Sequence, residues 1–308
     1  MKRYIIKAII AGVLIQGIQT RLMAQQEAMF TQYMFNGLLI NPAYAGSHNN
    51  LSMSALFRTQ WVGLDGAPST QSFSAHSPLG SSRVSMGMSF LHDKIGIFDQ
   101  YGMFSSYSYR IPLNEEQDFF LYFGLQGGFS SYTIAYSIVS ASDPVYNSGD
   151  IRELYPNVGT GLYLASKRFY FGASVPQLLT AKNIGYEGPL LEQVYHLFIS
   201  TGYVFDLNKS LKLKPNILLK AVEGAPAEMD INLNMLIKEV LWAGLSWRSM
   251  DSFDALFQIQ INERMQFGYS YDFITLTDIK RVSAGSHEFN LNYMLSFNKR
   301  RIITPRYF

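Results

Sequence analysis

Two short stretches of this sequence carry residue types that nucleophilic catalysis uses. His76-Ser77 places an imidazole next to a hydroxyl, and Gly285-Ser286-His287-Glu288 supplies both groups together with a carboxylate. A hydrolase needs these groups to converge in one pocket, with the base within hydrogen-bonding reach of the nucleophile. Consecutive residues of a β-strand face opposite sides, so His76 and Ser77 cannot form a dyad within one strand. The sequence therefore favours a protein that is not an enzyme.

Metal, cofactor and nucleic-acid chemistry find equally little support in the sequence. Cysteine is absent, which excludes thiolate metal sites and disulfides. Gly159-Thr160-Gly161 lacks the third glycine and the following helix of a phosphate-binding loop. A formal net charge of +2 predicts no nucleic-acid partner. No metal-ligand spacing relates the five histidines, which are His48, His76, His92, His196 and His287. We expect no cofactor and no metal.

Charged residues recur on the polar faces of segments in which polar and apolar residues alternate. They are Arg58, Arg110, Asp230, Arg248, Asp254 and Asp272. If these segments are strands of a barrel, the six side chains point into its lumen. Two interpretations stay open: a network that stiffens the barrel and holds loops or a plug, or a selectivity lining for a small solute.

The alternation is strongest between Ala227 and Phe273, where it runs through four successive segments of about ten residues. In the first segment, Met229, Ile231, Leu233, Met235 and Ile237 alternate with Asp230, Asn232, Asn234, Leu236 and Lys238. A period of two predicts β-strands, and ten tilted residues suffice to cross a bilayer. The polar faces are too hydrophilic for a dry core, so we expect lipid outside and a wet lumen inside.

The whole chain shares this character. Only 16% of its residues are charged, and its mean hydropathy is +0.02, values typical of a transmembrane β-barrel whose faces cancel in the average. We predict an all-β outer-membrane barrel of about 14 antiparallel strands. Pro215 predicts a bulge or a break in its strand. The other expected strands are Leu51–Trp61, Thr70–Ser77, Arg83–His92, Tyr101–Ile111, Asp118–Phe129, Asn157–Ser166, Phe169–Val175, Tyr195–Phe205, Leu211–Lys220 and His287–Phe297.

The connections between these strands alternate in length. Short ones are expected at Pro78–Ser82, Leu113–Gln117, Lys167-Arg168, Asn208–Ser210, Lys238-Glu239 and Asn262–Arg264. Long ones are expected at Val62–Ser69, Asp93–Gln100, Ser130–Pro156, Pro176–Val194, Ala221–Pro226 and Ile274–Ser286, and Ser249–Ser252 breaks the rule. Outer-membrane barrels keep short turns in the periplasm and long loops outside. With an even strand number, both termini are then periplasmic.

Four regions follow along the chain. Residues 1–24 read as a signal peptide, with a basic start and a short apolar run. Residues 25–50 are rich in aromatics and asparagine, which favours an ordered, plug-like periplasmic segment over a mobile leader. Residues 51–297 form the barrel, and residues 298–308 a periplasmic tail. The basic residues of the tail are interpreted as a solvated or headgroup-contacting end, or as a docking tail for a partner.

Several motifs in this order resemble one family. Gln32-Tyr33-Met34-Phe35-Asn36 and Asn41-Pro42-Ala43-Tyr44-Ala45-Gly46 are followed by Arg58-Thr59-Gln60-Trp61-Val62-Gly63 and Gly268-Tyr269-Ser270-Tyr271-Asp272. Together they resemble the PorP/SprF family, outer-membrane components of the type IX secretion and gliding machinery. The resemblance extends over essentially the whole mature chain.

The resemblance implies a non-enzymatic role in exporting or surface-anchoring a secreted cargo, such as a gliding adhesin, by protein–protein recognition. Expected partners are outer-membrane lipid, the cargo, and periplasmic and outer-membrane type IX secretion components. We expect Met29–Gly46 to brace the periplasmic side of the barrel, and loops Ser130–Pro156 and Pro176–Val194 to meet cargo. A solute-conducting channel is the alternative. The candidate partner-binding residues are Tyr33, Phe35, Asn36, Asn41, Pro42 and Tyr44.

Overall fold

The computed structural model describes seven stretches of the chain: residues 29–80, 83–116, 118–138, 149–180, 194–222, 225–275 and 278–296. The expected signal peptide and the carboxy-terminal tail lie outside the described residues. Within these stretches, no helix is both long enough and apolar enough to cross a bilayer.

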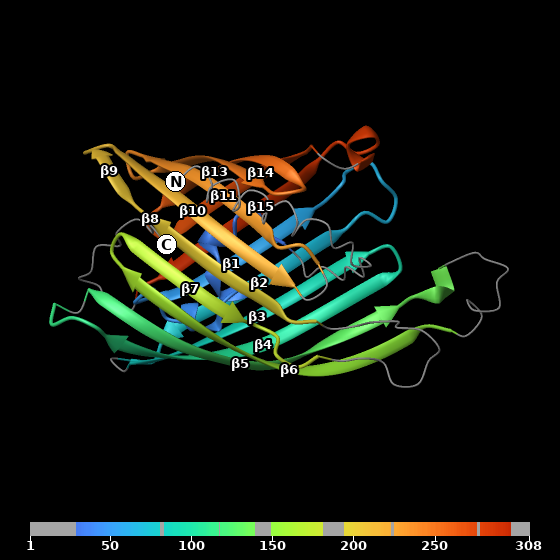
Figure 1. The fold of residues 1–308 in the computed structure, drawn as a ribbon, viewed down its shortest axis with the longest axis horizontal. Coiled ribbons are helices and arrows are strands. Elements are labelled where there is room, and N and C mark those ends of the chain that lie inside the picture. Colours follow the sequence, from blue (N-terminus) through green and yellow to red (C-terminus); the bar gives the residue numbers. More distant parts are fainter. Residues whose placement is uncertain are drawn as a thin grey trace, which may run out of the picture.

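The described residues form one closed antiparallel β-sheet, a barrel (Figure 1). β1 pairs with β15, and β10 pairs with β11, so the sheet has no open edge between first and last strands. β8 and β9 both pair with β10 and are two pieces of one strand, which gives a barrel of 14 strands. The fold class predicted from the alternation is confirmed. The strands are β1 Leu51–Thr59, β2 Ser69–Pro78, β3 Val84–Ile95, β4 Phe98–Pro112, β5 Phe119–Ile134, β6 Ile151–Ser166, β7 Phe169–Val175, β8 His196–Tyr203, β9 Phe205–Asn208, β10 Leu211–Val222, β11 Glu228–Ile237, β12 Leu241–Arg248, β13 Ser252–Asn262, β14 Met265–Ile274 and β15 Ser286–Leu295.

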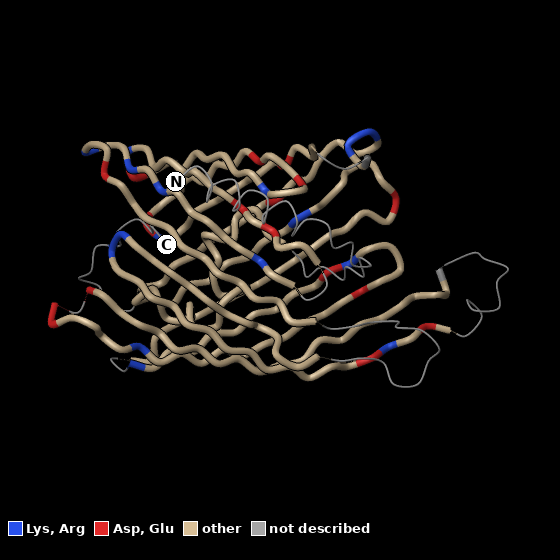
Figure 2. The backbone as a smooth tube through the Cα atoms, viewed as in Figure 1, with Lys and Arg blue, Asp and Glu red and all other residues tan. Residues whose placement is uncertain are grey.

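The two faces of the sheet have the predicted chemistry. On β11, Ile231 and Leu233 are 41% and 50% exposed, whereas Asn232 and Asn234 are fully buried in the interior. Figure 2 shows charged residues mainly towards the two ends of the barrel, with few in the middle of the strands. An apolar outer band between more polar ends is what a bilayer requires, so the exposed aliphatic and aromatic side chains face lipid.

Pro215 does not break its own strand. It lies within β10, opposite Leu233 of β11. The interruption falls in the strand on the other side of β10, where Val204 separates β8 from β9. Proline lacks the N–H that a ladder needs, and the strand beside it is interrupted at Val204, whose backbone N–H donates to the Arg168 carbonyl next to β7 at 2.8 Å. The β10–β9 pairing also shifts register between Leu211 and Lys212. The strand of Pro215 is therefore irregular near the proline but not broken at it.

Two expected long connections are shorter than predicted. Asp93–Gln100 is a hairpin in which only Gly96 and Ile97 separate β3 from β4, and Gly96 takes a positive φ of 56°. β5 and β6 also extend beyond the expected strands, to Ile134 and from Ile151, and their hairpin projects past its neighbours (Figure 1). Alternation predicts where a strand crosses the membrane, but it does not mark where pairing ends outside it.

The remaining described elements are short 3₁₀ turns. Three of them, η1 Tyr33–Phe35, η2 Gly37–Leu39 and η3 Pro42–Tyr44, lie inside the barrel. The other two, η4 Tyr136–Ile138 and η6 Asp278–Arg281, belong to connections between strands. We call residues 29–46 the inner segment.

Candidate functional site

The inner segment occupies the lumen of the barrel. The side chains of the six candidate partner-binding residues are all buried there: Tyr33, Phe35, Asn36, Asn41, Pro42 and Tyr44. A lumen that is only wet is therefore a wrong expectation, because polypeptide fills it at this level.

Glycines in the barrel wall make room for the inner segment. An ideal Cβ at Gly124 would lie closer than 3.0 Å to the backbone of Ala43. A Cβ at Gly161 would meet the side-chain oxygen of Asn41 in the same way. Such separations essentially never occur between real atoms. Gly124 therefore admits the backbone of the segment only as glycine, and a side chain at position 161 would displace the side chain of Asn41. Gly161, from the Gly159-Thr160-Gly161 stretch, thus belongs with Gly124 to the wall glycines on which the inner segment packs, which we call the glycine bed.

Hydrogen bonds hold the second half of the segment on this bed. Asn41 caps η3 by accepting from the Ala43 N–H at 2.9 Å, and its amide nitrogen donates to the Leu162 carbonyl at 2.9 Å. Ser174 Oγ donates to the Ile40 carbonyl at 2.6 Å, and Ser108 Oγ to the Ala45 carbonyl at 2.5 Å. These contacts satisfy backbone carbonyls that 3₁₀ turns leave unpaired.

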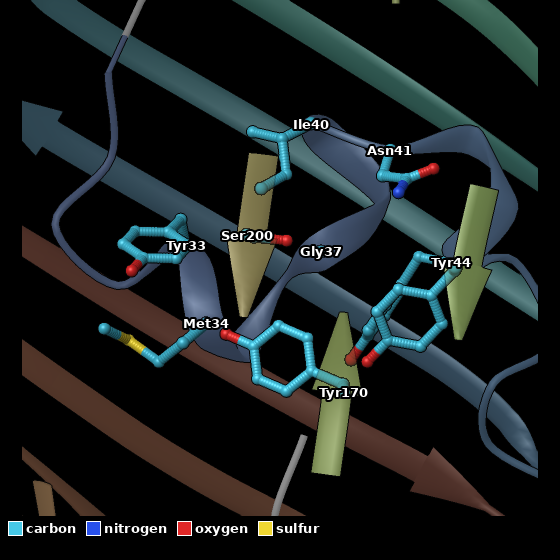
Figure 3. A pocket seen from close by; sticks show the side chains of 9 residues that line it. Tyr33, Met34, Gly37, Ile40, Asn41, Tyr44, Tyr170 and Ser200 are labelled. Carbon is cyan, nitrogen blue, oxygen red and sulfur yellow. The ribbon is translucent and has the colours of Figure 1, made fainter. Parts of the chain in front are cut away.

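Aromatic rings fill the space that remains. The ring centroids of Tyr44 and Tyr163 lie 5.4 Å apart, edge to face, and those of Phe35 and Trp242 lie 6.1 Å apart. The cavity beside the ring of Tyr44 measures about 20 Å³ (Figure 3), and a second cavity, beside Leu91, about 40 Å³. A buried water needs roughly 10–15 Å³ on this scale, so each cavity has room for only a few water molecules.

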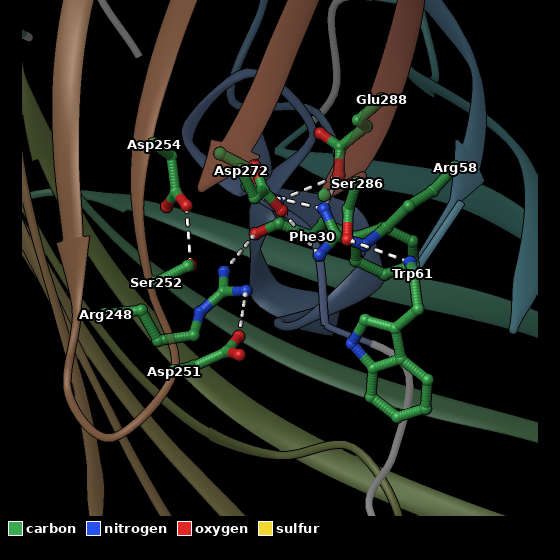
Figure 4. Close-up of polar contacts among 12 residues, drawn as sticks. Phe30, Arg58, Trp61, Arg248, Asp251, Ser252, Asp254, Asp272, Ser286 and Glu288 are labelled. Carbon is green, nitrogen blue, oxygen red and sulfur yellow. Dashed lines mark hydrogen bonds and ion pairs between the residues drawn. The ribbon is translucent and has the colours of Figure 1, made fainter. Parts of the chain in front are cut away.

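A buried charge network holds the first half of the segment. Arg58 binds Asp272 at 2.7 Å and Glu288 at 3.1 Å, and it donates to Thr31 Oγ1 at 2.9 Å (Figure 4). Glu288 also accepts the backbone N–H groups of Thr31 and Gln32, at 2.9 and 2.8 Å. Arg58, Asp272 and Glu288 are at most 2% exposed. Two carboxylates, one guanidinium and the backbone of the segment therefore form one charge-assisted unit.

A second ion pair lies on the neighbouring strands. Arg248 binds both oxygens of Asp230 at 3.0–3.1 Å and donates to the Phe30 carbonyl at 3.3 Å. Asp254 accepts from Ser252 Oγ at 2.6 Å. Five of the six predicted lumen charges thus gather around residues 30 and 31. Arg110 is separate: it donates to Asn49 Oδ1 at 2.8 Å and stacks on Phe120.

The position of this network corrects the expected placement of the inner segment. Arg58, Asp272 and Glu288 lie at the ends of β1, β14 and β15 that lead into the expected long connections. The opposite end of the segment, near Ala45, meets Ser108 on the short-turn side of β4. The segment therefore runs through the lumen between the two ends of the barrel instead of bracing only the short-turn end.

Sequence reasoning missed two members of the site. Glu288 was considered only for catalysis, although its alternation with Phe289 marks an inward position. In the structure Glu288 faces Arg58, while Tyr269 Oη lies 2.8 Å from the His287 ring nitrogen, so the two side chains do not converge. Lys214, whose ammonium lies 5.4 Å from the centre of the Phe35 ring, has the same inward parity as Asn216 in the Leu211–Lys220 stretch, so parity could have found it too. Among the described residues, no group of three or more acidic, histidine or cysteine side chains is placed to hold a metal.

A loop carboxylate outside the membrane ties the ends of the projecting hairpin together. Asp150 accepts from the backbone N–H and the hydroxyl of Ser137, at 2.9 and 3.1 Å. These hydrogen bonds favour the charged carboxylate and hold the pKa of Asp150 below its ordinary value. At neutral pH the described base of this loop is therefore closed.

Comparison with known proteins identifies the family. The sequence profile described as type IX secretion system membrane protein PorP/SprF matches residues 22–293. This chain belongs to the PorP/SprF family. Its members are type IX secretion membrane proteins, and the barrel places this one in the outer membrane. A search of curated proteins gives no match.

Solved structures show the same fold at low identity. The CymD monoaromatic hydrocarbon channel superposes with a TM-score of 0.54 at 13% identity, covering 86% of this chain and 94% of that one. The Ralstonia pickettii toluene transporter TbuX gives 0.51 at 9% identity, covering 85% and 93%. At such identities the likeness concerns the barrel alone.

Proposed function

We propose that this PorP/SprF protein is a closed scaffold of the type IX secretion system that supports export or surface anchoring of one secreted cargo, such as a gliding adhesin. It acts by protein–protein recognition, with its amino and carboxyl ends on the periplasmic side. It contacts outer-membrane lipid along its sides and other type IX components at its periplasmic end.

The filled lumen carries this proposal. The inner segment is seated on glycines, hydrogen-bonded to wall side chains and bound to buried charges, and the cavities beside it hold only a few waters. A barrel built around a bound segment has little room to conduct solute. Recognition is then left to its ends.

We assign the recognition of cargo to the projecting β5–β6 hairpin with its loop, and to the connection between β7 and β8. Leu154, on the part of β6 that extends beyond the expected membrane strand, is 63% exposed. Ser137 and Asp150 close the described base of its loop. A rigid hairpin that presents apolar side chains suits protein recognition.

Replacing residues 139–148 and 181–193 with short glycine–serine linkers tests this assignment. The cargo that co-purifies with the wild-type protein, identified by mass spectrometry, is expected to be lost while the barrel stays folded. A linker at Asn114–Glu116, at the opposite end of the barrel, is the matched control and should retain the cargo. Equal retention of cargo by both variants would remove the two loops from the proposal.

A solute-conducting channel is the second candidate. Two observations favour it. The lumen is closed by the inner segment and not by wall side chains alone, so movement of that segment would open it. Ile40 also lines both cavities, which places them next to each other along the lumen. Single-channel recording separates the two functions. Steady ohmic current through the wild-type protein supports a channel, and absence of current supports the scaffold.

A further inference from the structure

The two halves of the inner segment are held by different kinds of contact. We call residues 29–36 the arm and residues 37–46 the anchor. They meet where Asn36 alone separates the 3₁₀ turns η1 and η2. Gly37 is fixed by close packing, because a Cβ there would lie 2.6 Å from the Tyr44 ring.

The anchor is fastened by shape. Gly124 and Gly161 receive its backbone and Asn41, serine hydroxyls bind its carbonyls, and the chain leads directly into β1. Each of these contacts needs the segment to keep one conformation. Removing the anchor would also pull on the first strand of the barrel.

The arm is held by apolar packing along its length, where Phe30, Tyr33, Met34 and Phe35 join a buried cluster with wall residues. At its inner end Asn36 accepts from Ser74 Oγ at 2.8 Å.

At its outer end the arm is held by charge. Thr31 and Gln32 bind Glu288, Thr31 binds Asp272 and Arg58, and the Phe30 carbonyl binds Arg248. Each of these hydrogen bonds replaces one that the same wall group makes to water when the arm is absent. These hydrogen bonds do not constrain the path of the main chain as Gly124 does under the anchor. One wall glycine, Gly268, also receives the arm, but it faces the end of the Gln32 side chain and not the backbone.

The wall on the arm side carries buried polar groups that the arm leaves unsatisfied. Asn232 uses its amide nitrogen to bind the Tyr33 hydroxyl at 3.0 Å, but its oxygen has no partner. Further side-chain atoms of β11, β13, β14 and β15 are buried without a hydrogen bond, on Asn234, Asp254, Gln258, Ser270, Asn290 and Asn292. On the anchor side, among the described residues of β2 to β6, this is true only of the hydroxyls of Ser72, Ser106 and Ser130.

This asymmetry points to a conformational device. A buried carboxamide without a partner disfavours the state that buries it, and hydration removes the penalty. We call the side chains listed above, on β11 and β13–β15, the amide wall. The docked arm gains its charge contacts and apolar packing, but it keeps the amide wall from water. From the opposition of these two effects we propose that the arm is releasable: it pivots at Asn36–Gly37 and exposes the amide wall, while the anchor stays in place.

The absence of cysteine from the chain allows a direct test with single reporters. Met34→Cys reports on the arm and Ala45→Cys on the anchor, and both side chains are buried in the docked state. The probe is a water-soluble methanethiosulfonate reagent applied to the full chain in lipid vesicles. Thr31→Ala removes the hydroxyl that binds Asp272 and Arg58. Thr201→Ala, which removes a hydroxyl bound to the Tyr170 carbonyl, is the matched control.

With Thr31→Ala, labelling of Met34→Cys is expected to accelerate roughly tenfold or more, the scale of one charge-assisted hydrogen bond. Labelling of Ala45→Cys should not change, and Thr201→Ala should leave both rates alone. Equal acceleration at both reporters would mean that the segment leaves as one piece. No acceleration at Met34→Cys would mean that the arm is not releasable. Either result overturns the proposal.

The amide wall gives a second test with the opposite sign. Replacing Asn234 and Asn292 together by leucine removes four unsatisfied atoms, so the docked arm is favoured and labelling of Met34→Cys is expected to slow. Faster labelling would contradict the proposed balance. Cargo is absent from both experiments, so their failure would leave the secretion role untouched, and loss of that role would leave the arm as described.

Discussion

Replacing Arg58 by leucine removes the only cation within ion-pair distance of both Asp272 and Glu288 among the described residues. The two carboxylates are 2% and 0% exposed, so neither can recover the loss from bulk solvent. Breaking a buried ion pair by removing one partner costs about 3–5 kcal/mol. We expect Arg58→Leu to destabilise the barrel by about that amount.

Arg110→Leu is the matched comparison. Arg110 is partly exposed, and its partners are an asparagine amide and an aromatic ring. Loss of such contacts costs about 1 kcal/mol or less. Urea-induced unfolding of both variants in lipid vesicles, followed by tryptophan fluorescence, measures the difference. Equal destabilisation of the two variants would refute the assignment of Arg58 to a buried network.

A double variant separates lost attraction from stranded charge. Removing both members of a buried pair costs less than removing one. Arg58→Leu with Glu288→Leu should therefore be more stable than Arg58→Leu alone, although Asp272 stays unpaired. If the two losses simply add, Arg58 and Glu288 are not coupled.

Three further outcomes are expected. Gly124→Ala forces a Cβ into the inner segment and should destabilise the barrel by about 1–3 kcal/mol, whereas Gly127→Ala, with nothing within 4 Å, should leave urea unfolding nearly unchanged. Leu233→Arg places a charge on the lipid-facing side near the middle of β11 and should cost about 2–4 kcal/mol in the same assay; no effect would contradict the outward orientation. The contact of Asp150 with Ser137 stabilises the loop above the ordinary carboxyl pKa of 3.8 and is lost only as pH falls through the lowered folded pKa, so an NMR titration of Asp150 with a midpoint at or above 3.8 would contradict it.

The transmembrane part of the fold could be predicted from sequence because lipid imposes one rule along each strand. A period of two, with apolar residues outward, fixes both the strand and its facing. The rule holds on β11, where Leu233 faces out and Asn234 in. It does not govern the ends of strands, and the β3–β4 connection and the length of the β5–β6 hairpin were wrong for that reason.

The path of the inner segment was beyond this reasoning. Its burial in the lumen depends on contacts between residues more than a hundred positions apart, such as Asn41 with Leu162 and Thr31 with Asp272. The wall glycines that admit it look in sequence like ordinary strand glycines. Aromatic and asparagine content indicated an ordered segment, but not which end of the barrel it reaches.

Inward charges were partly predictable. Parity along a strand gives the direction of Arg58, Arg248 and Asp272, but not the pairs they form. Those depend on register between strands, which places Arg58 opposite Glu288 and Asp230 opposite Arg248. Arg110 faces inward, as its parity predicts, but it lies at the other end of the barrel from the network. Parity gives the face of a strand and not the position along the barrel.

The occupancy of the lumen is tested most directly by photo-crosslinking from position 35 in native outer membranes. With a benzophenone amino acid in place of Phe35, we predict an adduct, mapped by mass spectrometry, with the wall peptides that contain Trp242 or Lys214. An adduct with another protein, or none with the chain's own strands, would contradict a lumen filled by the inner segment.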